Sequence, residues 1–433
     1  MLSVKIDHST AYPVEVIILK IGEFARKHAI SINTVRYYIN MGLILPEATN
    51  KQYRFNEQNM QDVELILQLK QYGFPIGQIH EILSLMRISN LASQDDVLEY
   101  IDILENKKGK LHAELNRLQQ TIAELGEYIE TIRSMHDKLA VRPRHIGVPI
   151  EFMPMLCCPH CTGNLGFADA SIENGHILGA QLSCQCGYHA SIMNGILVTQ
   201  GRHISELDSP DLDRKFYKDL PASWVSLFQR SYNWIFSRMR QMDLKNKVVM
   251  ENHINCYFFL YVMLGKIDPD ALYIVSDKYP EIVTLYKELI ESQNLNLKIL
   301  FLADSSFKYP LRPNCVDLYI DYCSINEYSI FETQNDLIDV MRPYFKEGAD
   351  MLGTYFYFDS GSASHRKLMA EYPICFRQNY LLHHFNGLMQ RNAFNLIATK
   401  NNGYVTDAGS KNRNFTFHVA GDKLHLQSYH YKI

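Results

Sequence analysis

The spacing of apolar residues predicts two short helices near the N-terminus, over residues 21–28 and 32–40. Ser31 stands where a hydroxyl can cap the second helix, and Gly42 stands where that helix would stop. Two short helices joined by a tight turn form a helix-turn-helix, whose second helix enters the major groove of DNA. That helix would present short polar groups suited to base edges or phosphates at Ser31, Asn33 and Thr34.

A polar and basic stretch at residues 47–55 follows these helices and predicts a β-hairpin. A hairpin beside a recognition helix is a wing, and three of its side chains could grip the DNA backbone: Lys51, Tyr53 and Arg54. Asn56 then caps a longer helix that ends before Gly73, and Pro75 can open a further helix. We therefore expect a winged helix-turn-helix domain over residues 18–88.

A strict seven-residue repeat of apolar positions runs through residues 94–139 and predicts one long coiled-coil helix. Such a seam favours self-association into a homodimer, although an amphipathic helix can instead pack on its own chain. Lys108 occupies one seam position, where it would weaken a layer and help to set the register. The two seam rows are Ile101, Lys108, Leu115, Ile122, Ile129 and Leu104, Leu111, Leu118, Leu125, Ile132.

Five of the nine cysteines fall within thirty residues, in a segment that we predict to be a zinc-binding domain over residues 152–200. Residues 140–149, which contain prolines and show no periodicity, predict a linker before it. Two cysteine pairs on opposing turns can supply four thiolates to zinc, which favours a structural over a catalytic or sensing metal. The predicted ligands are Cys158, Cys161, Cys184 and Cys186, with Cys157 as an adjacent spare.

Strand-like and helical runs alternate through residues 205–433, which predicts a doubly wound, Rossmann-like α/β domain. The tail is expected to form an antiparallel hairpin at one edge of the sheet, from residues 415–419 and 424–431. The predicted central strands are 248–250, 271–275, 298–302, 316–320 and 351–358.

Charge is distributed unevenly along the chain. The net charge is −4, yet residues 19–55 hold six basic and two acidic residues, which leaves an excess of eight negative charges elsewhere. A basic segment on an acidic chain is typical of a phosphate-binding module attached to another domain. The chain has no apolar run long enough for a membrane span and no N-terminal signal layout, so we expect a cytoplasmic protein.

Five short motifs follow one another in the head: Ile21 to Ala25, Arg36-Tyr37-Tyr38, Gly42 to Pro46, Tyr53-Arg54 and Gly73-Phe74. In these motifs and their order the head resembles the MerR family of transcriptional regulators. The resemblance implies a homodimer on double-stranded promoter DNA, with the long helices paired antiparallel and an overlong promoter spacer distorted by binding. It also implies that Arg36, Tyr37 and Arg54 contact phosphates while residues around Asn33 face bases.

The rest of the chain resembles another family. The cysteine segment is similar to zinc ribbons that precede certain class I methyltransferase domains. Residues 205–433 look like a class I S-adenosylmethionine-dependent methyltransferase, in which Asp277 would meet the ribose and Asp304 the adenine. The first motif departs from that family, because its glycine-rich loop is replaced by Glu251 to Cys256 and no glycine follows until Gly265.

These features leave three interpretations of the C-terminal domain. The one we favour is a degenerate methyltransferase fold that is not an enzyme and senses a small-molecule effector, with Glu251, Asp277 and Asp304 as candidate contacts to S-adenosylmethionine or another ligand. The alternative is an active S-adenosylmethionine-dependent methyltransferase whose MerR head provides autoregulation. The third is a domain that only mediates oligomerisation or partner contact.

Overall fold

The computed structural model describes residues 18–49, 52–139, 145–199, 209–213, 220–255, 257–331, 335–373, 375–407 and 415–433. The chain divides into two compact units, residues 1–134 (unit 1) and residues 135–433 (unit 2).

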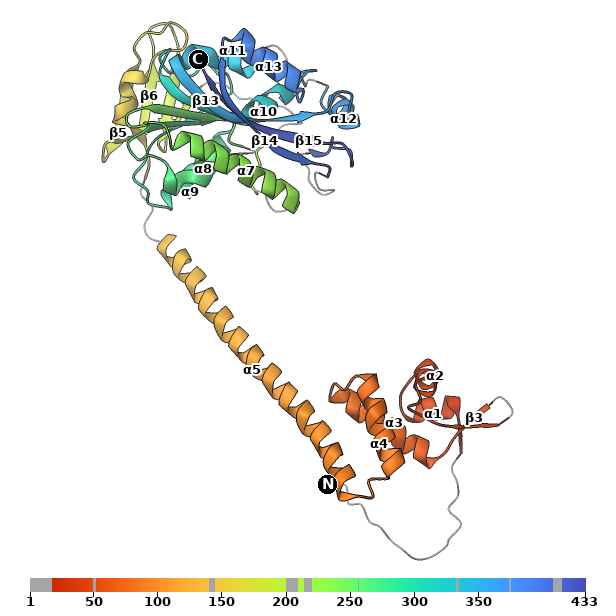
Figure 1. The fold of residues 1–433 in the computed structure, drawn as a ribbon. Helices are drawn as coiled ribbons and strands as arrows, with labels where there is room; N and C mark the ends of the chain where they lie inside the picture. The colour runs from red at the N-terminus through yellow and green to blue at the C-terminus, as the bar shows by residue number, and fades with distance from the viewer. Residues whose placement is uncertain are drawn as a thin grey trace, which may run out of the picture. The chain divides into compact units, whose positions relative to one another are not determined.

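Unit 1 is a winged helix-turn-helix followed by a long helix, as the sequence predicts (Figure 1). The wing is a small antiparallel sheet in the order β1-β3-β2. The long helix α5 has the bounds that the heptad repeat indicates. The elements are β1 (Leu19–Lys20), α1 (Ile21–Lys27), α2 (Ile32–Asn40), β2 (Glu47–Thr49), β3 (Gln52–Phe55), α3 (Glu57–Gln71), α4 (Ile76–Ser89) and α5 (Gln94–Leu139).

The core of unit 1 joins the helix-turn-helix to the wing. Phe24 of α1 stacks on Phe55 of β3 with ring centroids 4.1 Å apart, and both side chains are fully buried. Arg87 of α4 pairs with Asp62 of α3 at 2.7 Å and also donates to the carbonyl of Gly42. Gly42 has a φ of +71°, a conformation that favours glycine, and it ends α2 as the sequence indicates. These contacts join the wing to α1, and the end of α2 to α3 and α4.

Unit 2 is built on a twelve-stranded sheet in the order β14-β15-β13-β12-β9-β10-β11-β8-β7-β6-β4, with β5 paired to β6. Strands β13, β12, β9, β10, β11 and β8 run parallel, and the strand order reverses on either side of β9. This is the predicted doubly wound arrangement. The strands are β4 (Val148–Pro149), β5 (Gly166–Glu173), β6 (His176–Ser183), β7 (His189–Met193), β8 (Ile196–Thr199), β9 (Val248–Asn252), β10 (Leu272–Asp277), β11 (Lys298–Ala303), β12 (Val316–Tyr322), β13 (Phe345–Phe358), β14 (Asn395–Val405) and β15 (Leu424–Lys432).

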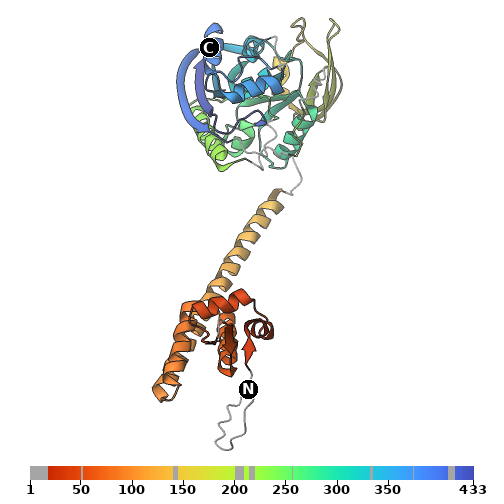
Figure 2. The same cartoon turned by 90° about the vertical axis from the view of Figure 1, so that its right-hand side faces the viewer.

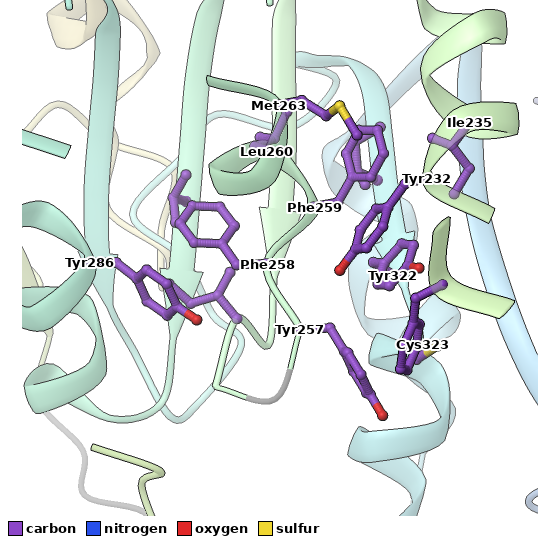
Figure 3. Packing of buried hydrophobic residues seen from close by; sticks show 14 of the residues in the cluster. Tyr232, Ile235, Tyr257, Phe258, Phe259, Leu260, Met263, Tyr286, Tyr322 and Cys323 are labelled. Carbon is purple, nitrogen blue, oxygen red and sulfur yellow. The ribbon is translucent and has the colours of Figure 1, made fainter. Parts of the chain in front are cut away.

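Helices cover both faces of the parallel part of the sheet. Helices α7, α8 and α9 pack on one face and α10, α11 and α13 on the other, each over its own hydrophobic core (Figures 1 and 2). In the first core, Tyr232 of α7 stacks on Tyr322 of β12 at 4.6 Å, with Phe259 beside them (Figure 3). The helices are α7 (Ala222–Met239), α8 (Phe259–Met263), α9 (Pro280–Glu291), α10 (Ser324–Phe331), α11 (Leu337–Met341), α12 (Ala363–Glu371) and α13 (Leu382–Arg391), with 3-10 turns at 150–155, 264–266 and 342–344.

Two features of unit 2 differ from the sequence prediction. The predicted hairpin of residues 415–419 with 424–431 is wrong, because β15 pairs with β14 on one side and β13 on the other. The alternation near Phe415 and Phe417 reflects burial instead: Phe415 packs on Trp224 at 4.6 Å and Phe417 lies on Phe358 at 6.2 Å.

The cysteine-containing strands are also continuous with the α/β sheet. Strand β8 pairs in parallel with β11 through Ile196↔Phe301, Leu197↔Leu302 and Val198↔Ala303. The predicted linker ends earlier than expected, because Val148 and Pro149 form β4 and pair with β6. Residues 145–199 and the α/β strands therefore share one sheet.

Candidate DNA interface, metal centre and ligand site

Helix α2 presents the polar groups that the sequence assigns to DNA. The side chain of Ser31 accepts a hydrogen bond from the backbone amide of Thr34 at 3.0 Å, which caps the helix. Val35 and Tyr38 turn into the core and are fully or almost fully buried. Four predicted contact residues therefore lie on the opposite, exposed face, with Thr34 half-buried: Ser31, Asn33, Arg36 and Tyr37.

The wing also exposes its predicted contacts. Tyr53 and Arg54 of β3 are exposed, whereas the next residue, Phe55, is fully buried. Lys51 lies outside the described residues. The structure thus presents seven of the eight predicted DNA-binding side chains on α2 or β3, and their contacts with DNA stay predictions.

Helix α5 carries an apolar face with no packing partner among the described residues of unit 1. Seven seam residues are between 43 and 69% exposed, a high value for large aliphatic side chains. Lys108 pairs with Glu105 on its own helix, at 3.2 Å. The exposed seam residues are Leu111, Leu115, Leu118, Ile122, Leu125, Ile129 and Ile132.

The four predicted metal ligands meet at one point. One sulfur from each of Cys158, Cys161, Cys184 and Cys186 lies within 4.8 Å of the other three. The sulfurs of Cys158 and Cys186 are 3.3 Å apart, and those of Cys161 and Cys184 are 3.4 Å apart. Tetrahedral zinc with Zn–S bonds of about 2.3 Å sets its sulfurs about 3.8 Å apart. The cluster therefore fits a four-thiolate zinc site.

Two tight turns position these thiols. The backbone amide of Thr162 donates to the carbonyl of Cys158, and the amide of Gly187 donates to that of Cys184. Burial raises the pKa of the Cys158 thiol, but hydrogen bonds from the backbone amides of Cys161 and His160 outweigh it and bring the pKa down to about 7. Amides directed at a sulfur stabilise a thiolate, which is the form that binds metal.

Glu251, the first candidate ligand residue, is fully buried at the end of β9. Its carboxylate accepts hydrogen bonds from the backbone amides of Phe259 at 2.7 Å and Leu260 at 2.8 Å, at the start of α8. Burial raises the pKa of Glu251 to about 8, although these two hydrogen bonds act to lower it. The side chain therefore belongs to the last part of the first central strand and binds protein backbone.

Asp277 and Asp304 are held in the same way. Asp277 accepts from the backbone amides of Asn255 and Tyr279, both at 3.0 Å. Asp304 accepts from the amides of Ser306 at 2.8 Å and Phe307 at 2.6 Å, and from the hydroxyl of Thr199. Ligand contact by Glu251, Asp277 and Asp304 stays a prediction.

Aromatic side chains occupy the space at the carboxyl ends of the central strands. His253 stacks on Phe307 with ring centroids 5.1 Å apart, and Tyr328 of α10 packs edge-on against both rings. His253 is 4% exposed and has a φ of +53°, so a buried imidazole stands in a backbone conformation that favours glycine. We call His253, Phe307 and Tyr328 the aromatic plug. The sequence shows the missing glycines, but only the structure shows what replaces them.

Two cavities in unit 2 adjoin these elements. One, of about 400 Å³, borders the plug at the ends of β11 and α10 and is lined by residues that include Ser306, Lys308 and Asp339. The other, of about 410 Å³, lies between the cysteine-containing strands and α9. Local sequence patterns indicate neither cavity, because each joins residues more than thirty positions apart. In the described part of the chain, no helix is both long and apolar enough to cross a membrane.

Comparisons with known proteins agree with the geometry of unit 1. Residues 19–85 match the family described as MerR HTH family regulatory protein, and residues 60–128 match the family described as MerR, DNA binding. The chain is 28% identical over 142 residues to the transcriptional regulator BrlR of Pseudomonas aeruginosa, covering 31% of this chain and 50% of that protein. It is 29% identical over 110 residues to the mercuric resistance operon regulatory protein of Bacillus cereus, covering 25% of this chain and 83% of that protein.

Solved structures also align with each unit. A SAM-dependent methyltransferase from Aquifex aeolicus aligns over 51% of this chain and 97% of its own, with 14% identity and a TM-score of 0.34. HiNmlR, a MerR family regulator lacking the sensor domain and bound to promoter DNA, aligns over 28% of this chain and 90% of its own, with 22% identity and a TM-score of 0.20. The chain spans half the length of the first curated relative that it matches. The family matches place the similarity to MerR regulators in residues 19–128, which include the exposed face of α2.

Proposed function

We propose that this protein is a homodimeric transcriptional regulator that binds double-stranded promoter DNA through the faces of α2 and the wing and responds to a small molecule bound by unit 2. The observation that carries the DNA-binding part is the exposed face of α2, where Ser31, Asn33, Arg36 and Tyr37 stand together on a capped helix. Exposed basic and short polar side chains on a recognition helix supply phosphate and base contacts respectively.

An Arg36→Ala variant is expected to bind all DNA sequences more weakly, and to lower the slope of log affinity against log salt by about one. The reason is that a guanidinium on a phosphate releases a counterion whatever the base sequence. The measurement is a salt-titrated gel-shift assay with a duplex selected from a random pool by the purified protein. Lys245→Ala, which removes an exposed positive charge from unit 2, is the matched control. Equal affinities for the two variants would refute the assignment of Arg36.

Homodimerisation through α5 follows from its exposed apolar seam. Burying these side chains against a second copy would remove large aliphatic surface from water, at about 25 cal/mol per Å². Two heads held by one coiled coil would meet two half-sites on DNA.

A Leu118→Glu, Leu125→Glu double variant is therefore expected to be monomeric at micromolar concentration, because two charges would enter the seam. Light scattering on the full-length chain measures the mass. Gln119→Glu, which adds a charge beside the seam, should remain dimeric. A monomeric wild-type protein would contradict the proposal.

A sensing rather than catalytic role for unit 2 is supported by the aromatic plug. Class I methyltransferases, which unit 2 resembles, use a glycine loop after the first strand to let backbone approach the cofactor. Here β9 ends with buried Glu251 and Asn252, and buried His253 follows it directly. The buried imidazole of His253, stacked on Phe307, fills space that a cofactor would need in order to reach this backbone. Zinc held by four thiolates has a closed coordination sphere, which favours a structural role for the cysteine cluster.

A further inference from the structure

The cavity of about 410 Å³ lies where the chain enters unit 2. Its walls come from the β5–β6 hairpin, the turn between β7 and β8, helix α9 and His145, three residues before β4. This volume falls in the range of small-molecule sites. The lining residues are His145, Glu173, Leu178, Asn194, Ile196, Thr284, Lys287, Glu288 and Glu291.

A buried carboxylate joins this cavity to the entering chain. The backbone amide of Ile146 donates to Oε1 of Glu291 at 2.6 Å, and the ammonium of Lys287 donates to the same oxygen. Glu291 and Lys287 are each 6% exposed. We call the bond from Ile146 to Glu291 the entry clasp. Among the described residues, both hydrogen bonds to this carboxylate end on Oε1, which leaves Oε2 to accept from a further donor.

Close backbone packing fixes the segment around Ile146. A side chain on Gly195 would place its Cβ 2.4 Å from the carbonyl oxygen of Ile146, so these two backbones meet directly. Ile146 is 3% exposed, and Val148 pairs with Ile177 of β6. Residues 146–149 are therefore packed against the β6 and β7–β8 backbone next to His145, which lines the cavity, and Glu291 bonds to the first of them.

The chemistry of the lining selects the class of ligand. Three carboxylates, Glu173, Glu288 and Glu291, face one ammonium, Lys287, so the walls hold an excess of negative charge. Leu178 and Ile196 add an apolar surface. A complementary ligand is an organic amine with an apolar body, whose ammonium would pair with Glu288 and the open oxygen of Glu291.

We propose that this cavity is the effector site of unit 2 and that it binds an organic ammonium compound. The inference rests on the proposed sensing function and names its site. The ligand shares Glu291 with the entry clasp, so its binding free energy is coupled to the conformation of residues 145–149, which follow α5 in the sequence.

The test uses the full-length protein and phenethylammonium as the probe. Uncharged 2-phenylethanol and anionic 3-phenylpropionate serve as shape-matched controls. We expect calorimetry to detect saturable binding of the cation alone at millimolar concentrations. Glu288→Gln should weaken that binding about tenfold, the loss of one charged contact. Glu281→Gln, on the exposed part of the same helix outside the cavity, should leave it unchanged.

Several results would overturn the proposal. The first is absence of saturable cation binding at millimolar concentrations. If 2-phenylethanol bound as tightly as phenethylammonium, the positive charge would not be what the cavity recognises. If Glu288→Gln and Glu281→Gln had equal effects on binding, the site would lie elsewhere. Cation binding that leaves DNA affinity unchanged in the gel-shift assay would exclude an effector role. Failure of the proposed DNA-binding function is distinct, because it would appear as unaltered DNA affinity in Arg36→Ala without any added amine.

Discussion

A Cys161→Ser variant is expected to lose its zinc and to unfold at a temperature about 10 °C below that of the wild-type protein. Cys161 is exposed, so the change to serine should itself alter the stability of the fold little. The fall in the unfolding temperature would come from the loss of the metal. The effect should not stay local. Strand β8, which ends the cysteine-containing hairpin, pairs with β11 of the parallel sheet. Disorder of the hairpin would expose the apolar edge of β11.

Both measurements for this variant are direct. Elemental analysis of the purified protein should find one zinc per wild-type chain. The chain has two tryptophans, Trp224 and Trp234, and both lie on α7, so tryptophan fluorescence reports the unfolding of unit 2 alone. Cys157→Ala is the control, because Cys157 neighbours the cluster without belonging to it and should keep the zinc. A metal-free wild-type protein with the same midpoint would overturn the zinc assignment.

Unit 2 is expected to lose stability as the pH rises from about 6 to about 8, by about 2 kcal/mol. The cause is Glu251, whose pKa burial raises from 4.5 to about 8 in the folded protein. A carboxyl group with a raised folded-state pKa binds its proton more tightly when folded. The stabilisation that Glu251 gives is complete at pH values below its pKa in the unfolded chain. It is lost as the pH rises through its pKa in the folded protein. Burial also raises the pKa of Asp321 to about 6, so that group acts mainly at lower pH.

The measurement is the fluorescence-detected unfolding midpoint across this pH range. Glu251→Gln should flatten the dependence, because the amide does not titrate, while one of the two hydrogen bonds to α8 is kept. Glu281→Gln, an exposed change on α9, should keep the wild-type slope. A midpoint that is constant or rises with pH in the wild-type protein would contradict the raised pKa of Glu251.

Much of the structure of unit 1 that presents the candidate DNA-binding side chains could be predicted because its signals are local. The capping of α2 by Ser31 joins residues three positions apart, and the seam of α5 repeats every seven residues. The cysteine pairs are likewise set by short turns. In these cases the interacting groups are neighbours along the chain, so composition and spacing determine which groups meet.

The ligand region of unit 2 could be predicted only in outline. Asp277 and Asp304 stand at strand ends as expected, but their carboxylates bind backbone amides. The aromatic plug combines residues 253, 307 and 328, which no local pattern connects. Strand β14 was missed because its residues are mostly exposed, as expected at the edge of a sheet.

The sequence by itself determined the winged head, the long helix with its seam, the four cysteines that cluster and the alternation of strands and helices. Each depends on periodicity or on spacing within a few turns of chain. The tertiary structure alone decided that β8 joins β11, that β15 lies between β13 and β14, and that Glu291 holds Ile146 beside a cavity. These contacts join residues as much as 145 positions apart, and they form because distant apolar faces must be buried together.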